Sequence, residues 1–130
     1  MTRWLAALLA AVLAALLAAP AAACPLAGTP LQGAAVQAAW RVDGPAIVVG
    51  QHFAIELQIC PQDATLARVD ATMPEHRHGM NYRPSLTPLG GGRWHAEGLM
   101  FHMAGRWELR FDIVDAGGHT ERLRESLTLP

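Results

Sequence analysis

The sequence predicts an all-β protein, an immunoglobulin-like antiparallel β-sandwich of about seven strands. Apolar and polar residues alternate with a period of two in several segments, which gives each segment one buried and one wet face. Turn-forming Gly, Pro and Asp residues separate these segments at spacings of roughly 8–15 residues. No convincing helical period interrupts the pattern, and a chain of this size suits a single sandwich.

Residues 1–23 have the features of a cleaved signal peptide. A basic residue precedes an apolar run at 4–19, and a proline and three alanines follow it. The run has 16 residues, fewer than the ~20 that a helix needs to span a bilayer. We therefore expect residues 24–130 to form one exported domain in the periplasm, outside the cytoplasm. An uncleaved N-terminal anchor is the alternative.

The strands are predicted from the alternation itself. Residues 25–33, rich in Pro and Gly, are expected to be an irregular leader. The clearest strand is 106–113, in which Trp107, Leu109, Phe111 and Ile113 alternate with charged residues. The other apolar positions that share one face within their segments are Val36, Ala38, Trp40, Val42; Phe53, Ile55, Leu57, Ile59; Val69, Ala71, Met73; and Leu123, Leu127, Leu129.

The two cysteines, Cys24 and Cys60, are predicted to form a disulfide. Export places them in an oxidising compartment, where a pair of cysteines usually joins. Cys60 has the polar parity of its strand, so its sulfur is expected outside the core, within reach of the leader. The bond would stabilise the fold by about 3–4 kcal/mol. In the alternative, Cys24 carries lipid and anchors the protein to a membrane, which leaves Cys60 unpaired.

Charge and motif content exclude several functions. Beyond Arg3 the chain has nine basic and eleven acidic residues, a formal charge of −2, so it has no general attraction for nucleic acid. Its two serines, Ser85 and Ser126, lie in no nucleophile motif. No cysteine lies near the histidines, whereas a blue-copper centre needs a thiolate. We therefore predict that the protein is not an enzyme.

Residues 73–82, M-P-E-H-R-H-G-M-N-Y, contain the first candidate ligands. His76, His78 and Met80 have the spacing i, i+2, i+4, and such side chains point the same way in an extended segment. A second pair, His102 and Met103, precedes the clearest strand. If the two segments lie side by side at one end of the sandwich, these five residues form a metal site.

The donor types favour one copper ion, Cu(I) or Cu(II). Thioether sulfur is a soft ligand that selects Cu(I), imidazole serves both copper states, and zinc sites seldom use methionine. His102 and Met103 are adjacent, so both can bind one ion only if the Ala104-Gly105 turn distorts the backbone; His102 is preferred. Met73 is expected in the core, whereas Met100 is left open between core residue and ligand.

Three further histidines look like ordinary surface or strand residues: His52, His95 and His119. Phe101, Tyr82 and Trp94 are near the motif in sequence and could shield a metal from water. Arg77 and Arg83 flank the motif and oppose a cation, and Glu75 offsets them in part.

The segment M-P-E-H-R-H-G-M, followed by G-L-M-F-H-M-A-G-R-W-E-L-R-F-D-I, resembles the YtkA-like and FixH-like domains of exported bacterial proteins. The resemblance covers roughly residues 50–115. It implies an immunoglobulin-like sandwich outside the cytoplasm, with a link to copper handling or respiratory oxidase assembly. Together with the ligand types, we expect a protein that carries, buffers or delivers copper, with a copper-receiving envelope protein as partner. By position, the motif falls on His76, His78, Gly79 and Met80, and its downstream part on His102 and Gly105.

A non-metal protein-interaction module of the cell envelope is the alternative function. Immunoglobulin-like sandwiches often serve only to contact other proteins. In that interpretation residues 74–88 form a recognition loop, with Arg77, Tyr82 and Arg83 as contact residues, because Tyr and Arg are enriched at binding hot spots.

Overall fold

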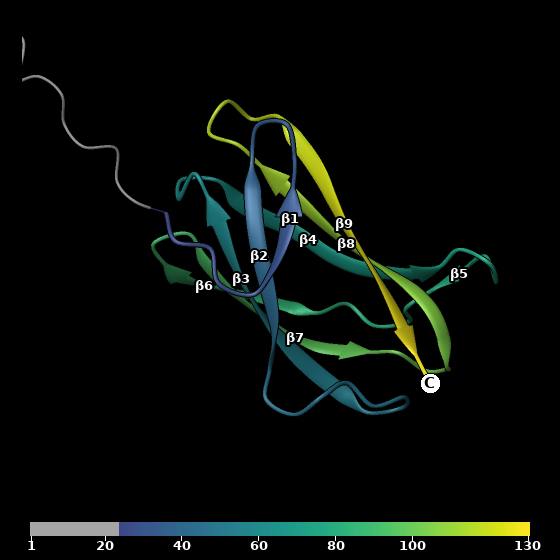
Figure 1. Ribbon diagram of the computed structural model, residues 1–130. Helices are drawn as coiled ribbons and strands as arrows, with labels where there is room; N and C mark the ends of the chain where they lie inside the picture. The colour runs from purple at the N-terminus through teal and green to yellow at the C-terminus, as the bar shows by residue number, and fades with distance from the viewer. Residues whose placement is uncertain (1–23) are drawn as a thin grey trace, which may run out of the picture.

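Two antiparallel sheets pack face to face (Figure 1). This computed structural model describes residues 24–130, and the predicted signal peptide, residues 1–23, lies outside them. The described residues contain strands and turns but no helix, so the predicted all-β sandwich is confirmed. Within residues 24–130, no helix is long and apolar enough to cross a membrane.

The structure has nine strands in the described residues, where the sequence predicted about seven. One sheet has the order β1-β2-β3-β7-β6 and the other β5-β4-β8-β9. The bounds in the first sheet are β1 Thr29–Gln32, β2 Gln37–Asp43, β3 His52–Cys60, β7 Arg93–Met100 and β6 Ser85–Gly90. In the second sheet they are β5 His78–Gly79, β4 Thr65–Met73, β8 Gly105–Val114 and β9 Thr120–Leu129.

The core lies between the sheets and is built from the predicted alternation. On β8 the four predicted apolar side chains are each 0 % exposed, and Met73 at the end of β4 is also 0 % exposed. Trp40 of β2 faces Phe111 of β8 across the core, with ring centroids 6.4 Å apart. Each buried side chain of this size stabilises the fold by about 1.5–3 kcal/mol. Met73 is therefore a core residue, as predicted.

The leader is more regular than the sequence indicated. Part of the segment 25–33 forms β1, which pairs with β2 from Thr29 opposite Trp40 to Gln32 opposite Gln37. Just before β1, a Cβ atom on Gly28 would lie 2.4 Å from the Trp40 carbonyl oxygen. Only glycine lets the leader lie this close to β2. Because β1 is a regular strand of the first sheet, the expectation of a wholly irregular leader was wrong.

The disulfide joins the leader to the end of β3. Cys24 and Cys60 are bonded, with Cα atoms 5.9 Å apart, a usual separation for a disulfide. Both residues are half-buried, outside the main core, as the parity of Cys60 predicted. The bond fixes the leader to the C-terminal end of β3, and His52 is at the other end of this strand.

Candidate metal centre

The first histidine segment is a tight turn that folds back on β4. The backbone N–H of His76 donates to the Met73 carbonyl (3.1 Å) and that of Met80 to the Ala71 carbonyl (2.9 Å). Between them, β5 pairs with the last two residues of β4. Arg77 adopts a φ of 54°, a left-handed conformation that is uncommon for residues other than glycine. The turn therefore holds His76 and His78 at the edge of the second sheet.

The second histidine segment is the irregular stretch between β7 and β8. The Gly50 N–H donates to the Phe101 carbonyl (2.8 Å) and fixes one end of the stretch. At the other end Gly105 has a φ of 119°, and a Cβ there would lie 2.9 Å from Cε of Met73. The dihedral angle favours glycine at this position, and a larger residue would also have to displace the terminal methyl of Met73. The stretch brings His102 next to the β4–β5 turn.

The structure brings three of the predicted ligands together, and we call His76, His78 and His102 the histidine cluster. The ring centroids of His76 and His78 are 5.7 Å apart, and those of His78 and His102 are 5.2 Å apart. Two imidazoles that bind one ion, each with a metal–nitrogen distance of about 2.0–2.1 Å, have centroids about 5 Å apart. Each pair is close to that spacing, with His78 common to both.

The cluster is two pairs and not a preformed three-imidazole site. Among residues 24–130, no group of three or more His, Cys, Asp or Glu side chains is arranged to hold a metal ion. His76 and His102 are exposed and His78 is half-buried, so the rings have room to turn. A third ligand must therefore come from a ring rotation or from another kind of donor.

The two predicted thioether ligands have contacts of their own. The Met80 sulfur lies 3.5 Å from the backbone nitrogen of Met100, which donates to it. Met103 is half-buried and packs against the core, and its carbonyl accepts the indole N–H of Trp107 (3.0 Å). His102 and Met103 lie outside the regular strands, so the opposite orientation expected in a regular strand does not apply to them.

Trp107 is the aromatic residue beside the cluster, a role that the sequence did not reveal. Its ring is edge-on to His102 at 5.3 Å and to His78 at 6.3 Å, and it stacks on Phe101 at 4.8 Å. Trp107 and Phe101 are both 0 % exposed. Of the three shields expected from sequence, Phe101 packs beneath the cluster through Trp107, whereas Tyr82 lies against His52. One indication of this role was present in the sequence: Trp107 is two residues after Gly105, at the start of the strand that follows His102.

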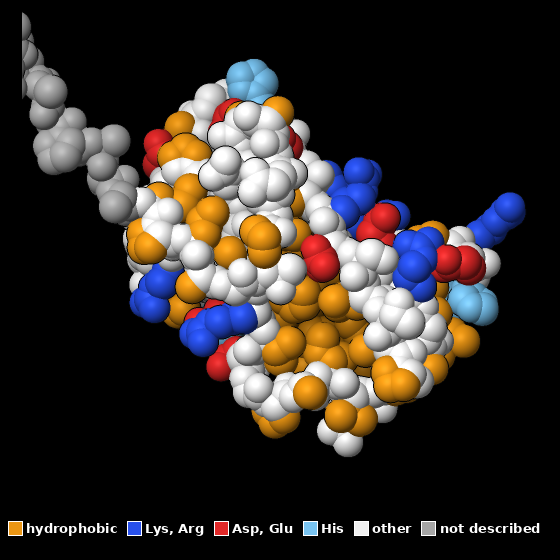
Figure 2. All heavy atoms as spheres, in the orientation of Figure 1, with side chains coloured by type: hydrophobic (Ala, Val, Ile, Leu, Met, Phe, Trp, Pro, Cys, Tyr) orange, Lys and Arg blue, Asp and Glu red, His pale blue; other side chains and the backbone are white. Residues whose placement is uncertain are grey.

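Charged side chains lie close to histidine at the β5 end, where Figure 2 shows acidic, basic and histidine side chains near one another. Glu75 forms an ion pair with Arg106 of β8 (2.7 Å), and the hydrogen bond from Arg106 holds the pKa of Glu75 below its usual value. The sequence suggested that Glu75 offsets Arg77 and Arg83. Its carboxylate instead joins the turn to β8, next to the second histidine segment.

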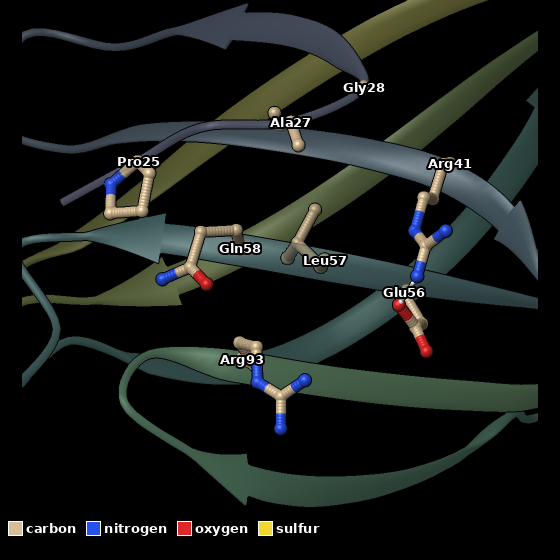
Figure 3. A pocket seen from close by; sticks show the side chains of 9 residues that line it. Pro25, Ala27, Gly28, Arg41, Glu56, Leu57, Gln58 and Arg93 are labelled. Carbon is tan, nitrogen blue, oxygen red and sulfur yellow. Dashed lines mark hydrogen bonds and ion pairs between the residues drawn. The ribbon is translucent and has the colours of Figure 1, made fainter.

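Three hollows on the described surface can be compared with the position of the histidine cluster. One of about 220 Å³ is on the outer face of β2 and β3 (Figure 3), where Arg41 and Glu56 form an ion pair and Gln58 and Arg93 line the opening. Another, of about 480 Å³, lies beside β4 and is lined in part by Met80 and Tyr82. A third, of about 330 Å³, lies at the start of β3 and is lined in part by Asp43 and His52. None of the three is lined by a member of the histidine cluster, which lies on the rim of the sandwich and not in one of these pockets.

Comparisons with protein-family models, with curated proteins and with solved structures gave no match to this chain. The resemblance to YtkA-like and FixH-like domains therefore stays a prediction.

Proposed function

We propose that the protein is an exported copper-binding protein that carries, buffers or delivers copper through the histidine cluster. One observation carries the proposal: His78 and His102 are 24 positions apart in sequence, yet their rings lie 5.2 Å apart. A separation near 5 Å is compatible with two imidazole ligands of one tetrahedral ion. His76, at 5.7 Å from His78, supplies the next donor.

The donors favour copper over zinc. The same two segments carry Met80 and Met103, and thioether sulfur beside imidazole is typical of copper ligation. Both donor types are neutral when they bind, so uptake and release of the ion need no thiol or carboxylate to change protonation. The Met80 sulfur currently accepts one backbone N–H, and a thioether is a weak acceptor that a copper ion can recruit at small cost.

The position at the rim suits transfer. The exposed rings of His76 and His102 can be reached by another protein, while Trp107 and Phe101 keep water from the inner side. A receiving envelope protein could therefore take the ion by replacing one ligand at a time. A buried site would instead have to open first.

The strand order supports the immunoglobulin-like part of the proposal. When strands β2, β3, β4, β6, β7, β8 and β9 are lettered A to G along the chain, the sheet orders β2-β3-β7-β6 and β4-β8-β9 become the A-B-E-D and C-F-G sheets of constant-type immunoglobulin domains. The histidine cluster then lies where the C and E strands end and the F strand begins.

Titration of the purified protein with Cu(I) and with Cu(II) tests the proposal. We expect tight binding of copper by the wild type, and loss of the equivalent held by the histidine cluster in the double variant His76→Ala/His78→Ala. His95→Ala is the matched control, because His95 is also a half-buried strand histidine but its ring faces Asp43 (3.1 Å). Copper binding that is the same in the double variant and the wild type would refute the proposal.

A further inference from the structure

A second group of soft donors continues from the histidine cluster toward the first sheet. His52 of β3 is directly opposite Met100 of β7 in the sheet register, and the Met80 sulfur lies 3.5 Å from the Met100 nitrogen. The ring of Tyr82 meets the His52 ring edge-on at 5.1 Å. We call His52, Met80 and Met100 the second donor group.

The two groups are adjacent because their chain segments run side by side in opposite directions. The ring of His78 lies beside that of His102. Two residues later in the first segment and two residues earlier in the second, the Met80 sulfur accepts the backbone N–H of Met100. Two more residues along the first segment, Tyr82 reaches His52. The donors thus follow one another from the β5 turn to the exposed end of β3.

Two members of the second donor group, His52 and Met100, share one side of the first sheet, and Met80 packs beside them against the edge of the core with its sulfur at the Met100 backbone nitrogen. Directly opposite residues of antiparallel strands point to the same face, with Cβ atoms about 4.5–5.5 Å apart. The neighbouring pair, Phe53 and Leu99, packs into or against the core, so His52 and Met100 point to the outer face. His52 is exposed and Met100 is half-buried, which leaves the imidazole and thioether accessible to an ion.

We infer that His52, Met80 and Met100 form a second binding position for Cu(I), beside the histidine cluster. One imidazole and two thioethers are a softer set than the cluster provides, so this position prefers Cu(I) to Cu(II). Met80 lies between the two positions and can serve either. The idea that a carried ion moves between the two positions rests on the proposed function. Binding at the second position itself requires only His52, Met80 and Met100.

Counting Cu(I) equivalents tests the inference. The purified protein is titrated without oxygen against a coloured Cu(I) chelator, with ascorbate as reductant so that the Cys24–Cys60 disulfide stays closed and supplies no thiolate. We expect two equivalents for the wild type and two for the control His95→Ala. We expect one equivalent for Met100→Leu, which keeps the side-chain volume and removes the sulfur, and one for His52→Ala.

The variants separate this inference from the proposed function. If His76→Ala/His78→Ala retains one equivalent that His52→Ala or Met100→Leu then removes, the second position is supported. A wild type that binds one equivalent, lost with the cluster histidines and unchanged in Met100→Leu and His52→Ala, would overturn the second position and leave the proposed function standing. If copper is lost only in Met100→Leu and His52→Ala, the proposed function of the histidine cluster is overturned and the second position stands.

Discussion

The two ends of β3 differ in how firmly their surroundings are held in place. At Cys60 the strand is bonded to Cys24, and nearby the carboxylate of Glu121 accepts backbone N–H groups of the β1–β2 turn. At His52 the strand reaches the imidazole and thioether groups, several of them exposed. Covalent and hydrogen bonds hold one end in place, while the other presents side chains that can rearrange. The difference indicates that the bonds at the Cys60 end can stabilise the fold without taking part in the copper binding that we propose for the other end.

Removal of the disulfide should have the largest effect on stability. The bond joins residues 36 positions apart, and a loop of that size corresponds to about 4 kcal/mol in the chain-entropy model. The double variant Cys24→Ser/Cys60→Ser should lose about that much free energy of unfolding, measured with urea. Copper binding by the folded fraction should be unchanged; a loss of both properties together would contradict the separation of the two ends.

Gly105→Ala should have the next largest effect and should act on both properties. A φ of 119° and a Cβ 2.9 Å from Cε of Met73 make alanine strained there, at a cost of about 1–3 kcal/mol. The change should also move the 101–104 stretch and weaken copper binding through His102. Gly118→Ala is the control, because that glycine has a φ of 85° but no atom within 4 Å of its Cβ position; it should leave copper binding intact.

Acid should lower the free energy of unfolding by protonating Glu121, which binds the β1–β2 turn near the disulfide. The hydrogen bond from the Ala34 N–H, followed by those from Ala35 and Val36, holds the pKa of Glu121 below its ordinary value of 4.5. A depressed pKa in the folded state contributes stability above the unfolded pKa, and that contribution is lost as pH falls below about 4.5 toward the folded value. Unfolding followed from pH 6 to pH 3 should show a smaller pH dependence in Glu121→Gln; an unchanged profile would exclude this carboxylate.

His78→Ala should have the smallest effect on stability. The side chain is half-buried and borders Trp107 without filling the core, so we expect a change of about 0.5 kcal/mol or less. Its effect on copper binding should nevertheless be large, because His78 belongs to both imidazole pairs. Thermal unfolding measured with and without copper would show this contrast, and a strongly destabilised variant would instead indicate a structural role.

The sequence predicted the strands whose alternation is regular and missed those whose alternation is interrupted. β8 follows a strict period of two, and all its predicted core residues are buried. In β7 the register shifts near Gly98, and β6 contains Pro88, which is compatible with its position at the edge of a sheet. These residues look like turn signals in isolation, so neither strand was recognised.

The sequence indicated which histidines the structure brings together, but not how they are arranged or what surrounds them. The spacing of His76 and His78 indicated two rings on one side, and His102 was proposed from the second motif. That Met80 meets Met100, or that Trp107 borders the rings, depends on how two loops from different sheets meet. A period-two pattern defines faces within one strand and says nothing about contacts between loops.

The most direct test of the account is the position of a copper ion in a crystal of the protein. We predict an anomalous-scattering peak at the copper absorption edge, within bonding distance of the His78 ring and of His76 or His102. A well-ordered crystal grown with copper that shows these three rings free, and copper absent or bound elsewhere, would contradict the central claim.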